Sequence, residues 1–317
     1  MTGARGALER LRAFSRSHPH LVTAAGTILV TGALAVALAS HRDEFATALG
    51  AASVWMLIGV TVLQVAWLAI RSETWNVCVN AAGGNAGRRR LYRCASFGYV
   101  GNLLNGQFGL AVRIGALRRC APDHSPKAPV LLATEVPIVV VEAALAAIMS
   151  FTLVGPLGLA WWAPLVMFAV VGIVLYGFGR LAHNRSHGFW RGFAVLRGMN
   201  GRNTVTALVI AAVGIQIARN WLVLNAVGVD ASVFDAVALL IAMAALGVLP
   251  VGPTVGAASA AIVFGSNAAA AAAAGALLTA TAAFAALAFA ALMFVVYWVR
   301  GPAPLSRPVT PRAAAPV

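Results

Sequence analysis

Charged residues are scarce in this chain. They make up 10% of its 317 residues, whereas hydrophobic residues make up 61%. A soluble domain usually carries about 25% charged residues, so this composition excludes an ordinary soluble protein. The polar stretches between the apolar runs are too short for a separate soluble domain. We therefore expect an all-α polytopic membrane protein.

Acidic residues and cysteines are also few. Nine acidic residues stand against 23 basic ones, which gives a formal net charge of +14. The basic residues lie in short segments between apolar runs, and this distribution argues against nucleic acid as a partner. The three cysteines are scattered and form neither a disulfide framework nor a metal-binding pattern. No nucleotide-binding loop, zinc signature or nucleophile elbow is present, so we expect no enzyme activity, no cofactor and no bound metal.

Long apolar runs predict about seven or eight transmembrane helices, because a span needs roughly 20 apolar residues. The expected spans are residues 21–40, 53–70, 128–154, 161–178, 204–227, 234–249 and 267–298, with a short helix at 257–265. They form one transmembrane domain, 20–299, between a basic segment at 1–19 and a proline-rich tail at 300–317 that we expect to be disordered. The run 21–40 follows a basic start, so a cleaved signal peptide is the alternative to the retained helix that we favour.

The basic residues fall on one predicted side of the membrane. Nearly all of them lie in residues 1–19, 71–127, 180–203 and the C-terminal tail. Arg42 and Arg219 are the exceptions. Cytoplasmic segments collect Lys and Arg, so we expect a bacterial inner-membrane protein with a cytoplasmic N-terminus, in which Trp67 and Trp75 lie near the interface.

One predicted span is interrupted by helix-breaking residues. Pro250 and Pro253 each remove a backbone N–H and obstruct the preceding helical turn. Gly252 and Gly256 allow backbone shapes that other residues resist. Such a break leaves unpaired backbone groups, which a bilayer tolerates only where protein or a polar cavity covers them. We interpret the stretch as a broken or re-entrant element that lines an internal site, and the alternative is a tight turn at the membrane surface.

A second interrupted segment lies at residues 95–110. It is apolar but rich in glycine and asparagine, including Asn102, Asn105 and Gly109, and it is short for a full crossing. We expect a re-entrant or partly inserted element over residues 98–113, with an interfacial loop as the alternative.

Three ionisable residues lie within the predicted spans: Glu135, Glu142 and Arg219. An ion in lipid costs about 2.5–3.5 kcal/mol on insertion scales, so these residues need partners or a function. One hypothesis is that Arg219, together with Arg113, binds an anionic lipid headgroup, while the glutamates balance the arginines or relay protons. The other is an internal Glu–Arg pair that only holds two helices in register. The glutamates are spaced to share one helical face, and Gln216 lies one turn before Arg219 on the same polar face.

Three stretches resemble one membrane family. The run from Pro250 to Gly256 resembles a Pro-x-x-Pro-Gly-Gly-x-Gly break. The run from Asn102 to Arg113 resembles a Pro-x-Arg-x-Gly-Glu-x-x-Arg segment, and the Leu-Asn-Ala-Val-Gly stretch at 224–228 resembles an Ala-Leu-Gly turn. All three are features of the lysylphosphatidylglycerol synthase transmembrane-region family, whose members are also described as flippase-like. The resemblance covers nearly the whole chain and implies a multi-spanning domain with re-entrant elements that moves or handles lipids.

The chain departs from the family pattern at three positions. Leu110 and Ser259 stand where acidic residues are usual, and Asn105 stands where the first motif has its proline, while Arg113 is retained. Without the two acids, the polar chemistry of the family is not implied for this chain. Larger relatives add an aminoacyl-transferring domain, and no such domain is recognisable in this sequence, so lipid aminoacylation is not expected.

Two functional hypotheses follow. In the first, the broken segments 98–113 and 250–259 meet near mid-membrane and form a polar groove. Half-helix N-termini, Arg113 and Arg219 attract a phosphate headgroup there, and the protein translocates an anionic lipid or lipid-linked substrate. In the alternative, the chain is a non-transporting scaffold for a membrane partner such as a glycosyltransferase or a lipid-modifying enzyme.

Overall fold

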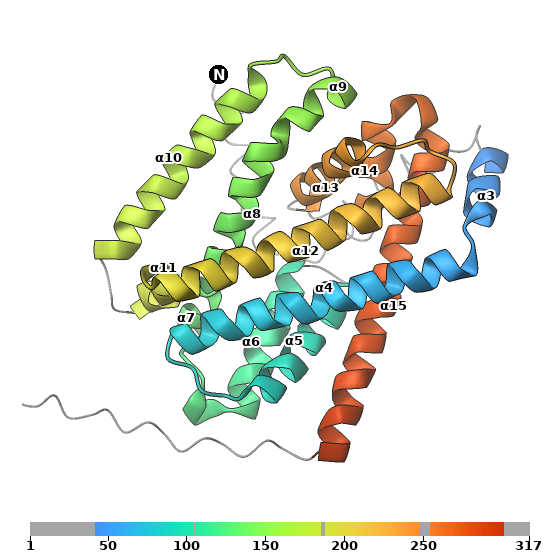
Figure 1. Ribbon diagram of the computed structural model, residues 1–317. Helices are drawn as coiled ribbons and strands as arrows, with labels where there is room; N and C mark the ends of the chain where they lie inside the picture. The colour runs from blue at the N-terminus through green and yellow to red at the C-terminus, as the bar shows by residue number, and fades with distance from the viewer. Residues whose placement is uncertain (1–41, 104–105, 185–187, 248–253, 301–317) are drawn as a thin grey trace, which may run out of the picture.

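Every regular element that the structure describes is a helix, which confirms the predicted all-α class (Figure 1). The computed structural model describes residues 42–103, 106–184, 188–247 and 254–300. The predicted features that lie outside these ranges are the N-terminal segment 1–19, the run 21–40, Asn105, Pro250, Gly252, Pro253 and the tail from residue 301.

Four helical segments of the described chain are long and apolar enough to cross a membrane. They are α4 (Val54–Ala81), the segment Ala128–Leu153, α12 (Met199–Ala226) and nearly all of α15 (Ala268–Arg300). The 28 residues of α4 and of α12 each extend about 42 Å, which exceeds the roughly 30 Å hydrocarbon core. Two further predicted spans correspond to shorter apolar helices in α10 (Ala163–Asn184) and α13 (Val233–Gly247). The structure fits a multi-pass membrane protein, and the number of seven or eight crossings stays a prediction.

The remaining elements connect these segments or pair with them. They are α3 (Arg42–Ala51), α5 (Arg88–Asn102), α6 (Gly106–Cys120), α7 (Ala128–Ala133), α8 (Val136–Met149), α9 (Val154–Leu157), α11 (Ala194–Arg197), α14 (Val255–Val263) and short 3-10 turns at Pro122–His124, Ser150–Leu153, Gly188–Phe193 and Gly265–Asn267.

Local sequence signals set several helix ends. Ser53 caps α4, because its hydroxyl accepts a hydrogen bond from the backbone N–H of Met56 at 3.3 Å. Ser232 and Asp235 form a reciprocal cap at the start of α13, in which each backbone N–H donates to the side chain of the other residue. Gly228 follows the end of α12 with a φ of 83°, a left-handed conformation that favours glycine.

The predicted span at 128–154 is divided at its proline. α7 and α8 are separate helices, and Pro137 lies in the first turn of α8 because it lacks an N–H and obstructs the turn before it. Glu135 therefore lies at the junction of two helices. The prediction that Glu135 and Glu142 share one face assumed a continuous helix, which the structure does not have.

The long helices form the framework of the molecule. α4 and α12 run antiparallel and side by side, and α15 crosses them (Figure 1). Val60 of α4, Leu224 of α12 and Leu278 of α15 are almost completely buried in the core cluster that joins the three helices. Because lipid is as apolar as these side chains, close packing holds such a core together inside a membrane.

Trp75, which we predicted to lie near a membrane interface, packs inside the protein, and its depth in the membrane stays a prediction. α4 continues to Ala81, beyond the predicted end of this span at Ile70. The indole of Trp75 is completely buried in a second core cluster, which joins α4 to α5 and α6.

The first predicted break, residues 98–113, covers the end of α5 and the start of α6, which pack against each other as a helical hairpin. Glycines allow the two helices to touch along their length. A Cβ atom at Gly98 would lie 2.7 Å from the Cβ of Arg113, and one at Gly101 would lie 2.9 Å from the Cα of Gly109. Each helix has 15 residues and is about 22 Å long, too short to cross the hydrocarbon core. The hairpin therefore suits an element that enters and leaves on the same side.

The second predicted break also separates two short helices. α13 ends at Gly247 and α14 begins at Val255, and the residues between them include the prolines outside the described ranges. α14 lies closely against α15, because a Cβ atom at Gly256 would be 2.6 Å from the carbonyl oxygen of Gly275. Each break thus follows a long helix: α4 precedes α5 and α6, and α12 precedes α13 and α14.

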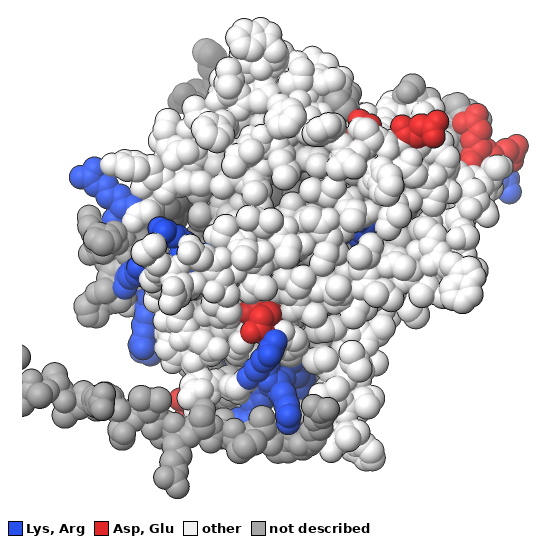
Figure 2. Space-filling view, viewed as in Figure 1, with Lys and Arg blue, Asp and Glu red and all other residues white. Residues whose placement is uncertain are grey.

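Charged side chains gather at two ends of the molecule (Figure 2). Basic side chains lie around α5, α11 and the end of α10, whereas acidic side chains lie around α3 and near the start of α13. Most of the surface between the two ends is apolar and exposes large side chains such as Ile173 of α10 and Phe284 of α15. Such a broad apolar surface is expected where a protein faces lipid.

Candidate functional site

A cavity of about 360 Å³ lies among the long helices and the two broken segments. Asn102 and Leu103 border it from the end of α5, and Val255 and Gly256 border it from the start of α14. The other polar side chains in its lining are Gln64, Trp67, Tyr99, Arg219 and Thr279. The two breaks, which are far apart in the sequence, therefore face one common space.

Arg219 is the only cationic side chain among the described residues that line this cavity. It is 3% exposed and reaches from α12 to α15. One terminal nitrogen, Nη2, donates to Thr281 Oγ1 at 3.0 Å and to the carbonyl oxygen of Leu278. The other, Nη1, donates to Gln216 Oε1 at 3.2 Å. The Nε of Arg219 is buried without a hydrogen-bond partner in the described chain, so one donor is left over.

A short polar chain extends from Arg219 in both directions. Gln216 donates from Nε2 to Gln64 Oε1 at 3.3 Å, and Gln64 itself lines the cavity. On the other side, the Thr281 hydroxyl also donates to the carbonyl oxygen of Leu277 at 2.7 Å. These neutral groups fix the position of the guanidinium without cancelling its charge.

The carboxylates of the interior are paired with other arginines. Glu135 forms an ion pair with Arg113, and Glu142 forms one with Arg71. No carboxylate in the described ranges forms an ion pair with Arg219. Arg219 is therefore a cation in the lining of the cavity that no carboxylate of the described chain neutralises.

Arg113 lies in a closed environment, away from the lining of the cavity. Its Cζ is 4.5 Å from the ring centroid of Trp75, and its side chain is 8% exposed. The guanidinium is therefore held between an aromatic face and a carboxylate. This arrangement holds α6 against α4 and against the junction of α7 and α8.

The structure sorts the predicted site residues into three groups. Those that line the cavity or bond its arginine are Asn102, Gln216, Arg219 and Gly256. Those held in ion pairs or in helix contacts are Gly109, Arg113, Glu135 and Glu142. Those that lie outside the described residues are Asn105, Pro250, Gly252 and Pro253.

Three polar residues that shape the interior were not predicted from the sequence. Arg71 was missed because the predicted span ended one residue before it, at Ile70, whereas α4 continues to Ala81. Gln64 and Thr281 are isolated polar residues within apolar runs. Their isolation was a usable signal, since polar side chains in membrane helices often bond across helices.

The chemistry of this arrangement is that of anion binding. A guanidinium presents planar N–H donors that match the oxygens of a carboxylate or a phosphate. Within the described ranges, no three His, Cys, Asp or Glu side chains are grouped so that they could hold a metal ion.

Comparisons of the chain with protein-family models, with curated proteins and with solved structures found no match. The resemblance to the lysylphosphatidylglycerol synthase transmembrane-region family therefore stays a prediction.

Proposed function

We propose that this protein binds the anionic headgroup of a lipid in the cavity beside Arg219 and moves that headgroup across the membrane. One observation carries the proposal: a buried arginine faces a cavity between two broken segments and has no acidic partner in the described chain. An unpaired charge away from water is unfavourable, so an anion in the cavity would be strongly stabilised by Arg219.

A phosphate group suits the cavity better than a neutral ligand does. The Nε of Arg219 is a buried donor without a partner, and a phosphate oxygen would accept its hydrogen bond. The start of α14 also borders the cavity at Val255 and Gly256, where the helix dipole favours a negative charge.

The size of the cavity supports a headgroup as the ligand. Small-molecule sites usually measure about 300–1,000 Å³, and this cavity is near the lower limit at about 360 Å³. A cavity of this size accommodates a headgroup and not two acyl chains. We therefore propose that the acyl chains stay in the lipid while the headgroup passes through the protein.

The charge distribution suggests the orientation. We propose that the protein lies in a bacterial inner membrane with its arginine-rich end, around α5 and α11, in the cytoplasm. Because the sequence has no ATP-binding motif, an ion gradient, the membrane potential or consumption of the lipid would drive net movement.

The test uses the full chain reconstituted into vesicles that contain a fluorescent phosphatidylglycerol. A membrane-impermeant quencher distinguishes the two leaflets, and the rate of exchange between them is measured. The variant Arg219→Leu should reduce the rate to that of protein-free vesicles. It should still fold, because Gln216 and Thr281 keep Gln64 and the Leu277 carbonyl as partners, and its thermal unfolding checks this.

Arg202→Leu is the matched control, since Arg202 is exposed in the first turn of the same helix and lies outside the cavity. Its rate should equal that of the wild type. If Arg219→Leu exchanges lipid between the leaflets as fast as Arg202→Leu does, Arg219 is not part of the headgroup site. If the wild-type protein does not speed lipid exchange and a membrane enzyme co-purifies stably with it, the scaffold alternative is favoured.

A further inference from the structure

A second hollow, a groove of about 190 Å³, lies at the arginine-rich end of the molecule. Its lining is Arg88, Arg89 and Tyr92 from the start of α5 and Met293, Val296 and Tyr297 from the end of α15. One side of this basic groove is cationic and the other is apolar. A phospholipid presents the same two chemistries where its headgroup meets its acyl chains.

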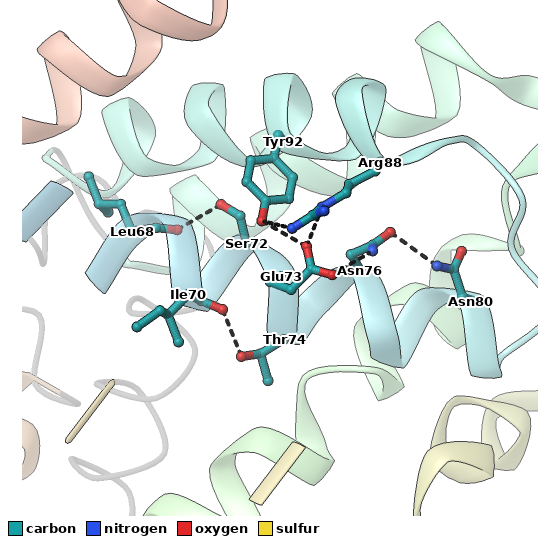
Figure 3. Close-up of polar contacts among 9 residues, drawn as sticks. All are labelled: Leu68, Ile70, Ser72, Glu73, Thr74, Asn76, Asn80, Arg88 and Tyr92. Carbon is teal, nitrogen blue, oxygen red and sulfur yellow. Dashed lines mark hydrogen bonds and ion pairs between the residues drawn. The ribbon is translucent and has the colours of Figure 1, made fainter. Parts of the chain in front are cut away.

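Arg88 is fixed in position by a polar network with α4 (Figure 3). Its Nε donates to Glu73 Oε2 at 2.7 Å, and the Tyr92 hydroxyl donates to the same oxygen at 2.7 Å. Asn76 donates to the other oxygen of Glu73 at 3.3 Å, and Asn80 donates to Asn76. The carboxylate thus orients Arg88 and neutralises one positive charge of the groove.

The charge that remains is positive. Arg89 is exposed and has no ion-pair or hydrogen-bond partner in the described chain. Arg93 lies behind the groove, with its Cζ 4.0 Å from the ring centroid of Tyr297, a cation–π contact that leaves its charge uncancelled. The groove therefore favours an anion at its α5 side.

The basic groove and the central cavity lie along the same face of α15. Leu278, Ala282 and Ala286 line the cavity, whereas Met293 and Val296 line the groove. Their spacings of three, four or seven residues place all five on one helical face. Phe289 lies on α15 between the two sets and is buried in the core, so the two spaces are separate in this structure.

Three aromatic rings separate the two spaces. The ring centroid of Phe289 is 6.0 Å from that of Tyr99, which lines the cavity. It is 6.5 Å from that of Tyr92, which lines the groove. The two spaces are therefore neighbours with a thin aromatic partition between them.

We infer that the basic groove is the site where an anionic phospholipid first binds on the arginine-rich side. Its phosphate lies against Arg88 and Arg89, and one acyl chain lies against Met293 and Val296. The inference rests on the proposed function in one respect: the lipid that binds in the groove is the one that then reaches the cavity at Arg219.

The experiment uses the full chain in vesicles that contain a photoreactive phosphatidylglycerol with a diazirine near the top of its acyl chain. Irradiation and peptide mass spectrometry should locate the label at residues 293–297. Arg89→Gln should lower this labelling about fivefold, the factor that one basic residue near a membrane surface contributes. Arg118→Gln, the same change at an exposed arginine in the last turn of α6, should leave it unchanged.

Three results would overturn the inference: labelling that Arg89→Gln does not change, labelling that Arg118→Gln lowers equally, or labelling that inorganic phosphate displaces. The first removes the groove as a site. The second would mean that the groove attracts the lipid only through the general positive charge of this surface. The third would mean that the ligand of the groove is free phosphate. Arg219→Leu separates the two proposals, because it should abolish headgroup movement and leave labelling of the groove intact. If movement is unaffected by Arg219→Leu, the proposed function fails while the labelling still decides the groove.

Discussion

The hairpin of α5 and α6 depends on glycines at its contact face, and replacing Gly98 tests this dependence. A Cβ atom at Gly98 would lie 2.7 Å from the Cβ of Arg113 and 3.0 Å from the carbonyl oxygen of Gly109. Neither atom belongs to the flexible end of a side chain. The variant Gly98→Ala can therefore be accommodated only if α5 and α6 move apart.

The expected size of the effect follows from two opposing contributions. Overpacking of a tight interface destabilises by about 1–3 kcal/mol. Alanine within a helix is more favourable than glycine by about 0.5–1 kcal/mol. The midpoints of the two ranges give a net loss of about 1 kcal/mol for Gly98→Ala. Gly115, on the outer side of α6, has nothing within 4 Å of a new Cβ, so Gly115→Ala should gain about 0.5–1 kcal/mol.

The assay is denaturant unfolding of the two purified variants and the wild type in the same detergent micelles. Gly98→Ala should unfold at a lower denaturant concentration than the wild type, and Gly115→Ala at a higher one. If Gly98→Ala is as stable as Gly115→Ala, α5 and α6 are not closed on each other at Gly98, and the hairpin contact is refuted.

Two further predictions concern the buried ion pair and the orientation. Glu135→Gln should lower the free energy of unfolding by about 3–5 kcal/mol, because Arg113 is then buried without a counter-charge. Adding Arg113→Met should restore most of this loss in thermal unfolding, and a double variant as unstable as the single one would contradict the pairing. Cys120 is the only exposed thiol of the three cysteines. A membrane-impermeant thiol reagent should label it in inside-out vesicles and not in right-side-out ones, and the reverse pattern would invert the proposed topology.

The breaks were predictable from sequence because they depend on local chemistry. Prolines and glycines near residue 250 interrupt any helix, and α13 indeed ends at Gly247 before α14 begins at Val255. The dense glycines near residue 100 likewise predicted an interrupted segment. The sequence did not show that Gly98, Gly101 and Gly109 meet across a hairpin, because that contact depends on how two helices pack.

The pairing of charges was not predictable for a related reason. Glu142 pairs with Arg71, which lies 71 residues earlier in the chain, and no periodic pattern encodes such a distance. Arg219 was recognisable as a cation within an apolar run, which singled it out as a residue that needs a partner. That it borders a cavity together with Gln64, and bonds to Thr281, depends on the packing of α4, α12 and α15.

The most direct measurement asks whether the two breaks face one another in the membrane. Leu103→Cys and Val255→Cys place one thiol at each side of the cavity in a variant whose native cysteines are replaced. A short bifunctional thiol reagent should link them in native membranes. In a second variant, which keeps Cys120 and carries Leu103→Cys but not Val255→Cys, the reagent should not link the two thiols, because Cys120 is at the far end of α6, about 22 Å away along the helix.

A link between residues 103 and 255, and none between residues 103 and 120, is the result we predict. If both thiols react with a monofunctional reagent but the bifunctional one does not link them, the breaks do not share a cavity. Arg219 would then face no common space between them, and the proposed passage of a lipid headgroup would lose its physical basis.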